Sequence, residues 1–148
     1  MISFESSVEI ARPVPDVFAY VADPAAHEPR WHTDVVRVRT EPEGPVALGS
    51  VLHATFRVLG RAAAGDADVV GFEPDRVIRY AFRAPTFGLR PTLTYAFAPA
   101  PTGTRFTRRV DGEPFGLMRL VGPLMRPALA RRNASFTKHL QRRLEASR

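Results

Sequence analysis

Apolar residues recur mostly every three or four positions along the last part of the chain, from Phe115 to Arg148. This spacing places side chains on one face of an α-helix. The segment is therefore predicted to form one long amphipathic helix. Pro123 and Pro127 either kink it or mark where its main part begins. The apolar positions are Met118, Val121, Met125, Leu129, Phe136, Leu140 and Leu144.

The rest of the chain reads mostly as strands, in which apolar and polar residues alternate. Two short helices, one starting near Pro15 and one running from Asp23 to Trp31, are predicted after the first strand. Because the connections are short, the sheet is predicted to be an antiparallel meander, with a loop over Ala84–Pro91 and a strand end at Gly112. The predicted strands are Ser3–Ala11, Val35–Thr40, Ser50–Leu59, Ala62–Phe72, Arg76–Arg83, Thr92–Ala98 and Thr104–Asp111.

The alternation within each strand also predicts which side chains face the helix. Phe and Tyr share one face of several strands, and Arg, Thr and His share the other. The aromatic face must turn inward, and a cavity for a small apolar molecule is expected between it and the long helix. The side chains predicted to converge there are Phe18, Trp31, Phe56, Tyr80, Phe82, Tyr95, Phe97, Met125 and Phe136.

Length and composition exclude several classes of protein. A chain of 148 residues is long enough for one domain, residues 1–148, with a substantial core. It has no cysteine, which excludes disulfides and thiolate metal sites. No apolar run approaches the roughly 20 residues that span a bilayer, and the first residues do not form a signal peptide, so a cytoplasmic protein is expected. A monomer and a homodimer both remain open.

The positive charge is concentrated in the predicted C-terminal helix. From residue 115 onward, seven Arg and one Lys stand against one Glu, a local charge of +7 within a net charge of +6. The face is either merely solvated or binds nucleic acid or an anionic membrane surface. Charge alone predicts weak binding at low salt that vanishes near physiological ionic strength. Specific nucleic-acid binding is not expected, because interleaved exposed aromatic residues are missing.

Most candidate acid–base residues are predicted to lie on the surface. His32 follows a turn, and His53 shares the parity of outward residues. Asp66 and Asp68 share one face of a strand, where a charged outer face explains them more simply than paired catalytic carboxylates. The sequence contains no metal-ligand spacing and no motif for a cofactor, so neither a metal nor a cofactor is expected.

Two polar residues interrupt apolar patterns that should face inward. Arg108 shares parity with Phe106 and Val110, which predicts that it points inward. There its charge would meet an anionic ligand group, a distant acid such as Asp68, or water. The alternative is a bulge that turns Arg108 outward. Asn133 lies in a gap of the helix stripe, where it either binds a ligand or contacts solvent.

Several local segments stand out beside the order of the elements. They are Val8–Pro13 followed by Val17–Val21, Pro29–His32, Leu48–Ser50, Phe72–Pro74 with Arg79–Tyr80, and Gly122–Leu124. These segments and the element order resemble those of the START-like (Bet v 1-like, SRPBCC) superfamily, in particular its bacterial polyketide cyclase/dehydrase-like group. The resemblance implies an α+β helix-grip fold, in which a curved antiparallel sheet of about seven strands wraps around the C-terminal helix. It also implies that Trp31 lies near the cavity mouth, where it either stacks on a ligand or closes the end of the sheet.

These observations favour binding of a small hydrophobic molecule, lipid-like or polyketide-like, as the function. The first alternative is a cofactor-free polyketide cyclase, aromatase or dehydratase, for which no catalytic residue is assigned. A convergent inward pair such as Arg108 with Tyr80 or Tyr95 would favour it. The second alternative is a nucleic-acid or membrane-surface protein that acts through its basic helix.

Overall fold

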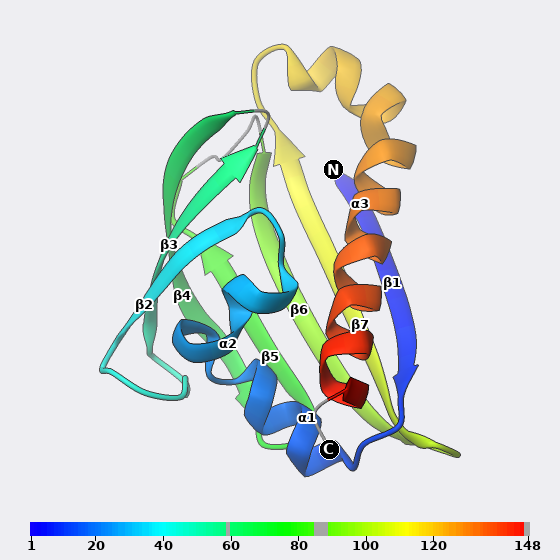
Figure 1. Cartoon of the computed structure of the whole chain (residues 1–148). Helices are drawn as coiled ribbons and strands as arrows, with labels where there is room; N and C mark the ends of the chain where they lie inside the picture. The colour runs from blue at the N-terminus through cyan, green and yellow to red at the C-terminus, as the bar shows by residue number, and fades with distance from the viewer. Residues whose placement is uncertain (59, 85–88, 147–148) are drawn as a thin grey trace.

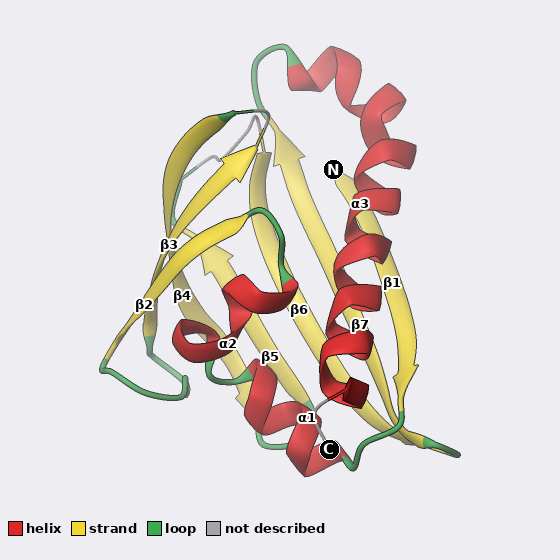
Figure 2. Cartoon of the chain, viewed as in Figure 1, coloured by secondary structure: helices red, strands yellow, loops and turns green. Residues whose placement is uncertain are grey.

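The computed structural model describes residues 1–58, 60–84 and 89–146 of the chain. A seven-stranded antiparallel sheet curves around one long helix (Figure 1), with the strand order β1-β7-β6-β5-β4-β3-β2. Figure 2 shows the sheet on one side and the helices within its concave face. The elements are β1 (Ile2–Ile10), α1 (Val14–Val21), α2 (Pro24–Trp31), β2 (Val35–Glu41), β3 (Val51–Val58), β4 (Arg61–Glu73), β5 (Val77–Phe82), β6 (Leu89–Ala100), β7 (Gly103–Pro114) and α3 (Met118–Ala146).

This arrangement confirms the predicted helix-grip fold, with two short helices after the first strand. The strand β1 pairs with β7, so the first and last strands lie side by side beneath α3. The short helices cover the other part of the concave face (Figure 2). None of the described helices is long and apolar enough to cross a membrane.

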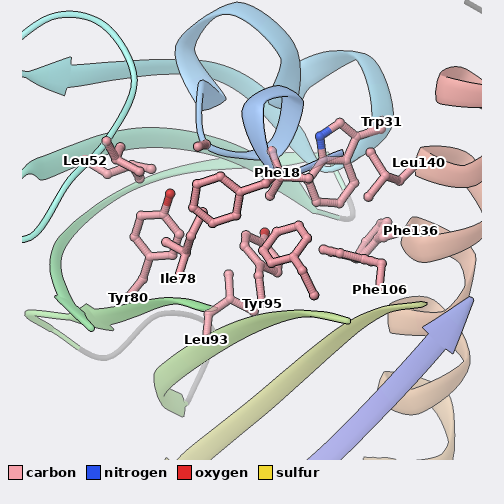
Figure 3. Close-up of a cluster of buried hydrophobic side chains, with 14 of the residues drawn as sticks. Phe18, Trp31, Leu52, Ile78, Tyr80, Leu93, Tyr95, Phe106, Phe136 and Leu140 are labelled. Carbon is pink, nitrogen blue, oxygen red and sulfur yellow. The ribbon is translucent and has the colours of Figure 1, made fainter. Parts of the chain in front are cut away.

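Strand alternation places the aromatic residues inward, as predicted. Tyr80 and Tyr95 are buried on neighbouring strands, whereas the outward Arg79 donates a hydrogen bond to Thr94 across the same pair of strands. Figure 3 shows the rings gathered between the short helices and the sheet. Trp31 packs edge-to-face on Tyr95, with ring centroids 6.0 Å apart, so α2 is held against the centre of the sheet.

The predicted start of β6 and the predicted end of β7 were both wrong. β6 begins at Leu89 rather than after Pro91, and β7 continues past Gly112 to Pro114, because these two ends pair with each other. A Cβ atom at Gly112 would lie 3.3 Å from Leu89, so a residue without a side chain permits the close approach. Leu59 and residues 85–88 of the predicted loop lie outside the described residues.

The long helix begins at Met118 rather than Phe115, and Pro123 and Pro127 both lie inside it. Figure 1 shows α3 as a bent helix whose first turns lean away from the axis of the remainder. Proline removes a backbone donor and clashes with the preceding turn, which accounts for the bend. The C-terminal half lies over the core, where Leu140 and Leu144 are buried.

Candidate functional site

A cavity of about 230 Å³ lies between the curved sheet and α3. Its wall is largely apolar, which suits a small hydrophobic molecule. Polar side chains from α2, β7 and α3 meet at one part of this wall. The lining residues are Phe4, Glu28, His32, Asp34, Val35, Leu52, Phe56, Tyr80, Phe82, Leu89, Pro91, Leu93, Arg108, Val110, Met118, Leu129, Arg132, Asn133 and Phe136.

Arg108 is the central polar residue of this wall. It projects inward from β7, as its parity predicts, and only 7% of its surface is exposed. Its Nη1 donates to Oδ1 of Asn133, and Nδ2 of Asn133 donates to the Arg108 carbonyl oxygen at 2.9 Å. The amide of Asn133 therefore holds both the side chain and the backbone of Arg108, and it joins α3 to β7.

The guanidinium of Arg108 also has aromatic neighbours. Its Cζ lies 5.3 Å from the ring centroid of Phe136 and 5.9 Å from that of Tyr95. Cations over aromatic faces are stabilised by the ring quadrupole, and more so when water is excluded. The charge is thus held by a hydrogen-bonding amide and two rings, and among the described residues it forms no ion pair with a carboxylate.

His32 lies at the same site, which corrects the prediction that it faces solvent. It is buried at the end of α2, and its ring stacks on Phe136 with centroids 4.0 Å apart. Nη2 of Arg108 lies 3.1 Å from Nε2 of His32. Because a guanidinium can only donate, Nε2 accepts and the proton of the neutral ring sits on Nδ1. Burial, followed by the positive charges of Arg108 and Arg132, lowers the pKa of His32 well below its usual value.

Glu28 is a buried acid that sequence inspection did not single out. Tyr95 Oη donates to its carboxylate at 3.1 Å. Burial raises the pKa of Glu28 to about 7, although the nearby positive charge of Arg108 opposes this shift. Helical spacing could have indicated this position, because Glu28 precedes Trp31 by three residues and His32 by four, which places the three on one face of a helix.

Several buried polar atoms at the cavity wall lack a protein partner. They are the Tyr80 hydroxyl, Arg108 Nε and His32 Nδ1. Nε of Arg108 is always a donor, Nδ1 of His32 is a donor in the tautomer above, and a tyrosine hydroxyl can donate. The polar part of the wall therefore offers hydrogen-bond donors, which is the pattern that suits carbonyl or carboxylate oxygens.

An ion pair fixes α3 beside this cluster. Nε of Arg132 donates to Asp34 at 2.7 Å, and the Asp34 carbonyl accepts from the backbone N–H of Arg57. This chain of contacts links α3, the start of β2 and β3. It keeps the helix face that carries Asn133 and Phe136 turned toward the sheet.

The eleven residues predicted to bind a ligand fall into three groups. Phe18, Trp31, Tyr95 and Phe97 are buried in the adjoining core rather than in the cavity wall, and Met125 is 40% exposed. Trp31 packs on Tyr95 and Phe106 in this core. The six that line the cavity are Phe56, Tyr80, Phe82, Arg108, Asn133 and Phe136.

Met125 was misplaced because the early turns of α3 do not follow one straight apolar stripe. Gly122 is buried there, and a Cβ atom on it would clash with the end of the Ile2 side chain. The helix therefore approaches β1 at Gly122, and Met118 and Leu129 contribute to the cavity on that side. Met125 lies outside this line of contact.

The remaining charged candidates face outward, as predicted. His53 Nδ1 lies 2.7 Å from Asp66, and Arg83 binds Asp68 through two hydrogen bonds of 3.0 and 2.8 Å. Asp68 is therefore not the partner of Arg108. Among the described residues, no group of three or more His, Asp or Glu side chains is arranged to hold a metal ion.

The curved antiparallel sheet around one long C-terminal helix defines the class of helix-grip proteins, and an apolar cavity with a buried arginine lies between sheet and helix. Residues 1–145 match the family described as "Polyketide cyclase / dehydrase and lipid transport", and the chain belongs to that family. No curated protein sequence matches the chain.

Solved structures with the same fold come from several sources. A START superfamily protein from Mycobacterium smegmatis is 16% identical, with 99% of each chain covered and a TM-score of 0.79. The di-domain ARO/CYC StfQ from the steffimycin biosynthetic pathway is 17% identical, with 98% of this chain and 51% of that chain covered and a TM-score of 0.78. Ara h 8.0201 is 14% identical, with 98% of each chain covered and a TM-score of 0.72. These likenesses establish the fold.

Proposed function

We propose that the protein binds a small hydrophobic molecule, lipid-like or polyketide-like, whose carboxylate or carbonyl end meets Arg108. One observation carries the proposal: a buried guanidinium lies at an apolar cavity and forms no ion pair with a carboxylate among the described residues. The family description supports it, since it includes lipid transport and polyketide chemistry.

The energetics of burial favour this type of ligand. A buried charge is costly unless polar or charged groups solvate it. Asn133 and His32, the hydrogen-bond partners of Arg108, are neutral, and Nε of Arg108 has no partner. The Glu28 carboxylate interacts with the charge of Arg108 without a direct hydrogen bond. A ligand carboxylate would add a charge-assisted hydrogen bond, while its apolar body would contact Phe56, Phe82 and other apolar lining residues.

The test compares an anionic and a neutral probe that share one aromatic frame, anilinonaphthalene sulfonate and N-phenylnaphthylamine, by fluorescence titration. Arg108→Met keeps much of the apolar bulk and removes the charge. We expect the anionic probe to bind this variant at least about tenfold more weakly, because charged hydrogen bonds contribute about 1.5–3 kcal/mol. Binding of the neutral probe should remain within about twofold.

Arg105→Met is the matched control, because Arg105 lies on the same strand but is exposed. It removes the same charge from the outer face and should leave both probes unaffected. Equal binding of the anionic probe to Arg108→Met and to the parent protein would refute the role of Arg108. Native mass spectrometry of the purified protein would then give the mass of any ligand that is retained.

A second candidate is cofactor-free aldol chemistry of the cyclase type. Glu28 favours it, because its pKa of about 7 lets the carboxylate accept a proton near neutral pH, and Arg108 and Tyr80 line the same cavity. In this reaction the Glu28 carboxylate removes a proton beside a carbonyl, and Arg108 stabilises the enolate oxygen. The enolate carbon then attacks a second carbonyl, and the resulting alkoxide receives the proton from Glu28.

The enzymatic candidate predicts turnover of a synthetic poly-β-ketone thioester, followed by mass spectrometry and ultraviolet absorbance. Cyclisation conserves mass, so the product is recognised by its retention time and absorbance. Glu28→Gln should abolish cyclisation while the neutral probe still binds. If the parent protein and Glu28→Gln leave the thioester to react at the rate seen in buffer alone, binding without catalysis is the function.

A further inference from the structure

Three leucines are exposed where α3 begins. Leu117, Leu120 and Leu124 are 72%, 77% and 81% exposed, among the most exposed large apolar side chains in the described part of the protein. Leu120 and Leu124 lie one turn apart on one face of α3. Leu117 ends the turn that leads into the helix, and its carbonyl oxygen accepts backbone hydrogen bonds from Leu120 and Val121. This leucine face lies on the bent portion of α3 that Figure 1 shows leaning out from the end of the sheet.

The same outward side of α3 becomes basic further along the helix. Arg131 and Lys138 follow Leu124 at intervals of seven residues, and Arg142 follows one turn later. All three are exposed, and in the described part of the chain none forms a salt bridge with an acidic side chain. They border a shallow hollow on the helix surface together with Ser135 and His139.

We propose that this outward face of α3 docks on an anionic membrane surface. Leu117, Leu120 and Leu124 enter the boundary between headgroups and acyl chains. Arg131, Lys138 and Arg142 contact lipid phosphates. An amphipathic helix that binds in this way combines buried apolar area with attraction to anionic lipids. The inference goes beyond ligand binding and does not depend on what occupies the cavity.

The position of the leucine face relative to the cavity supports this partner. Met118 lines the cavity and lies between Leu117 and Leu120 in the sequence. On the same segment of helix, one side therefore contributes to the cavity and the other presents leucines. A docked membrane would lie close to the part of the cavity wall that includes Met118 and Leu89.

A second copy of the chain fits this face less well. Three leucines offer roughly a few hundred Å² of apolar surface, well short of the roughly 800 Å² per partner in a stable interface. A twofold contact through α3 would also bring the exposed cations of one copy near those of the other, which like-charge repulsion disfavours. An anionic surface is attracted by these cations.

The test measures sedimentation of the full chain with vesicles of phosphatidylcholine alone or with about one third phosphatidylglycerol, at physiological ionic strength. The charge of the helix alone predicts binding that screening removes under these conditions. The exposed leucines predict binding that persists on the anionic vesicles. A leucine variant carries Leu117→Gln, Leu120→Gln and Leu124→Gln, and a charge variant carries Arg131→Gln, Lys138→Gln and Arg142→Gln. Each should bind the anionic vesicles at least about tenfold more weakly.

Two control variants match these changes elsewhere on the surface. Val36→Gln, Leu48→Gln and Val70→Gln remove three other exposed apolar side chains. Arg37→Gln, Arg61→Gln and Arg105→Gln remove three exposed charges from the strands. Both controls should bind within about twofold of the parent protein, and circular dichroism confirms that all four variants are folded.

Three outcomes would overturn the proposal. The first is that the parent protein does not sediment with anionic vesicles at physiological salt. The second is that the strand-arginine control loses as much affinity as the helix charge variant, which would show that only net charge matters. The third is a dimer in sedimentation velocity that the leucine variant converts to a monomer while vesicle binding is unchanged, which would assign the leucine face to a second copy of the chain.

Discussion

We expect the side chain of Asn133 to hold Arg108 in place, and Asn133→Ala tests this through the free energy of unfolding. Its amide is almost completely buried and makes two hydrogen bonds to Arg108, one to the guanidinium and one to the backbone carbonyl. A hydrogen bond to a charged group contributes about 1.5–3 kcal/mol and a neutral one about 0.5–1.5 kcal/mol. The substitution should therefore lower the free energy of unfolding by about 2–4.5 kcal/mol.

The assay is denaturant unfolding of the parent protein and the variant, with Ser135→Ala as the control. Ser135 lies two residues away in α3 and is exposed, so its replacement should change the free energy of unfolding by less than about 0.5 kcal/mol. A decrease in the free energy of unfolding of less than about 1 kcal/mol for Asn133→Ala would show that the two hydrogen bonds of the amide do not hold Arg108 in place. Arg108 would then be held by its aromatic neighbours and His32 without the amide.

Asn133→Asp separates stability from ligand binding. The carboxylate keeps an acceptor for Nη1 of Arg108, but its second oxygen faces the Arg108 carbonyl oxygen with no proton between them, so this variant should also be less stable than the parent protein. It also places a negative charge beside the guanidinium. The anionic probe should bind at least about tenfold more weakly, and the neutral probe should bind as before. Unchanged binding of both probes would mean that the charge of Arg108 does not contact the probe.

Three further predictions concern stability. Because the pKa of Glu28 is raised from 4.5 to about 7, the folded protein binds more protons than the unfolded chain between these values, and stability falls as pH rises through this window. Glu28→Gln should remove this dependence on pH. In denaturant titrations the free energy of unfolding of the variant, relative to that of the parent protein, should therefore rise by up to about 3 kcal/mol from pH 4 to pH 8. Leu140→Ala, in the core, should lower the free energy of unfolding by about 2–5 kcal/mol. Leu129→Ala should lower it less, because Leu129 is half-buried at the cavity wall, and equal losses would place Leu129 in the core. Gly103→Ala should cost at least about 1–3 kcal/mol, because its Cβ would lie 2.5 Å from the Ile10 carbonyl oxygen; an unchanged melting temperature would contradict this.

Local sequence patterns were sufficient to predict the architecture. Strand alternation identified the inward faces that carry Tyr80, Tyr95 and Arg108, and the helical spacing of Phe136, Leu140 and Leu144 identified the buried side of α3. The spacing of apolar residues predicts the buried side of an element, because side-chain directions repeat at every turn of a helix and at every second residue of a strand. For the same reason it identified His53 and Asp68 as outward residues.

The cluster around Arg108 depended on contacts between residues far apart in the sequence. Glu28 and His32 on α2 meet Arg108 on β7 and Asn133 on α3 only because the curved sheet holds both helices within its concave face. Periodicity cannot state which elements meet, nor that a turn carries His32 under Phe136. Periodicity likewise does not predict that Met125, Leu120 and Leu124 of α3, and Leu117 just before it, remain exposed. The sequence pattern was therefore enough to predict the order of the elements and most of their buried faces. Which polar groups share the cavity, and which apolar residues stay exposed, depends on the packing of the whole fold, because the burial of a side chain depends on neighbours that come from distant parts of the chain.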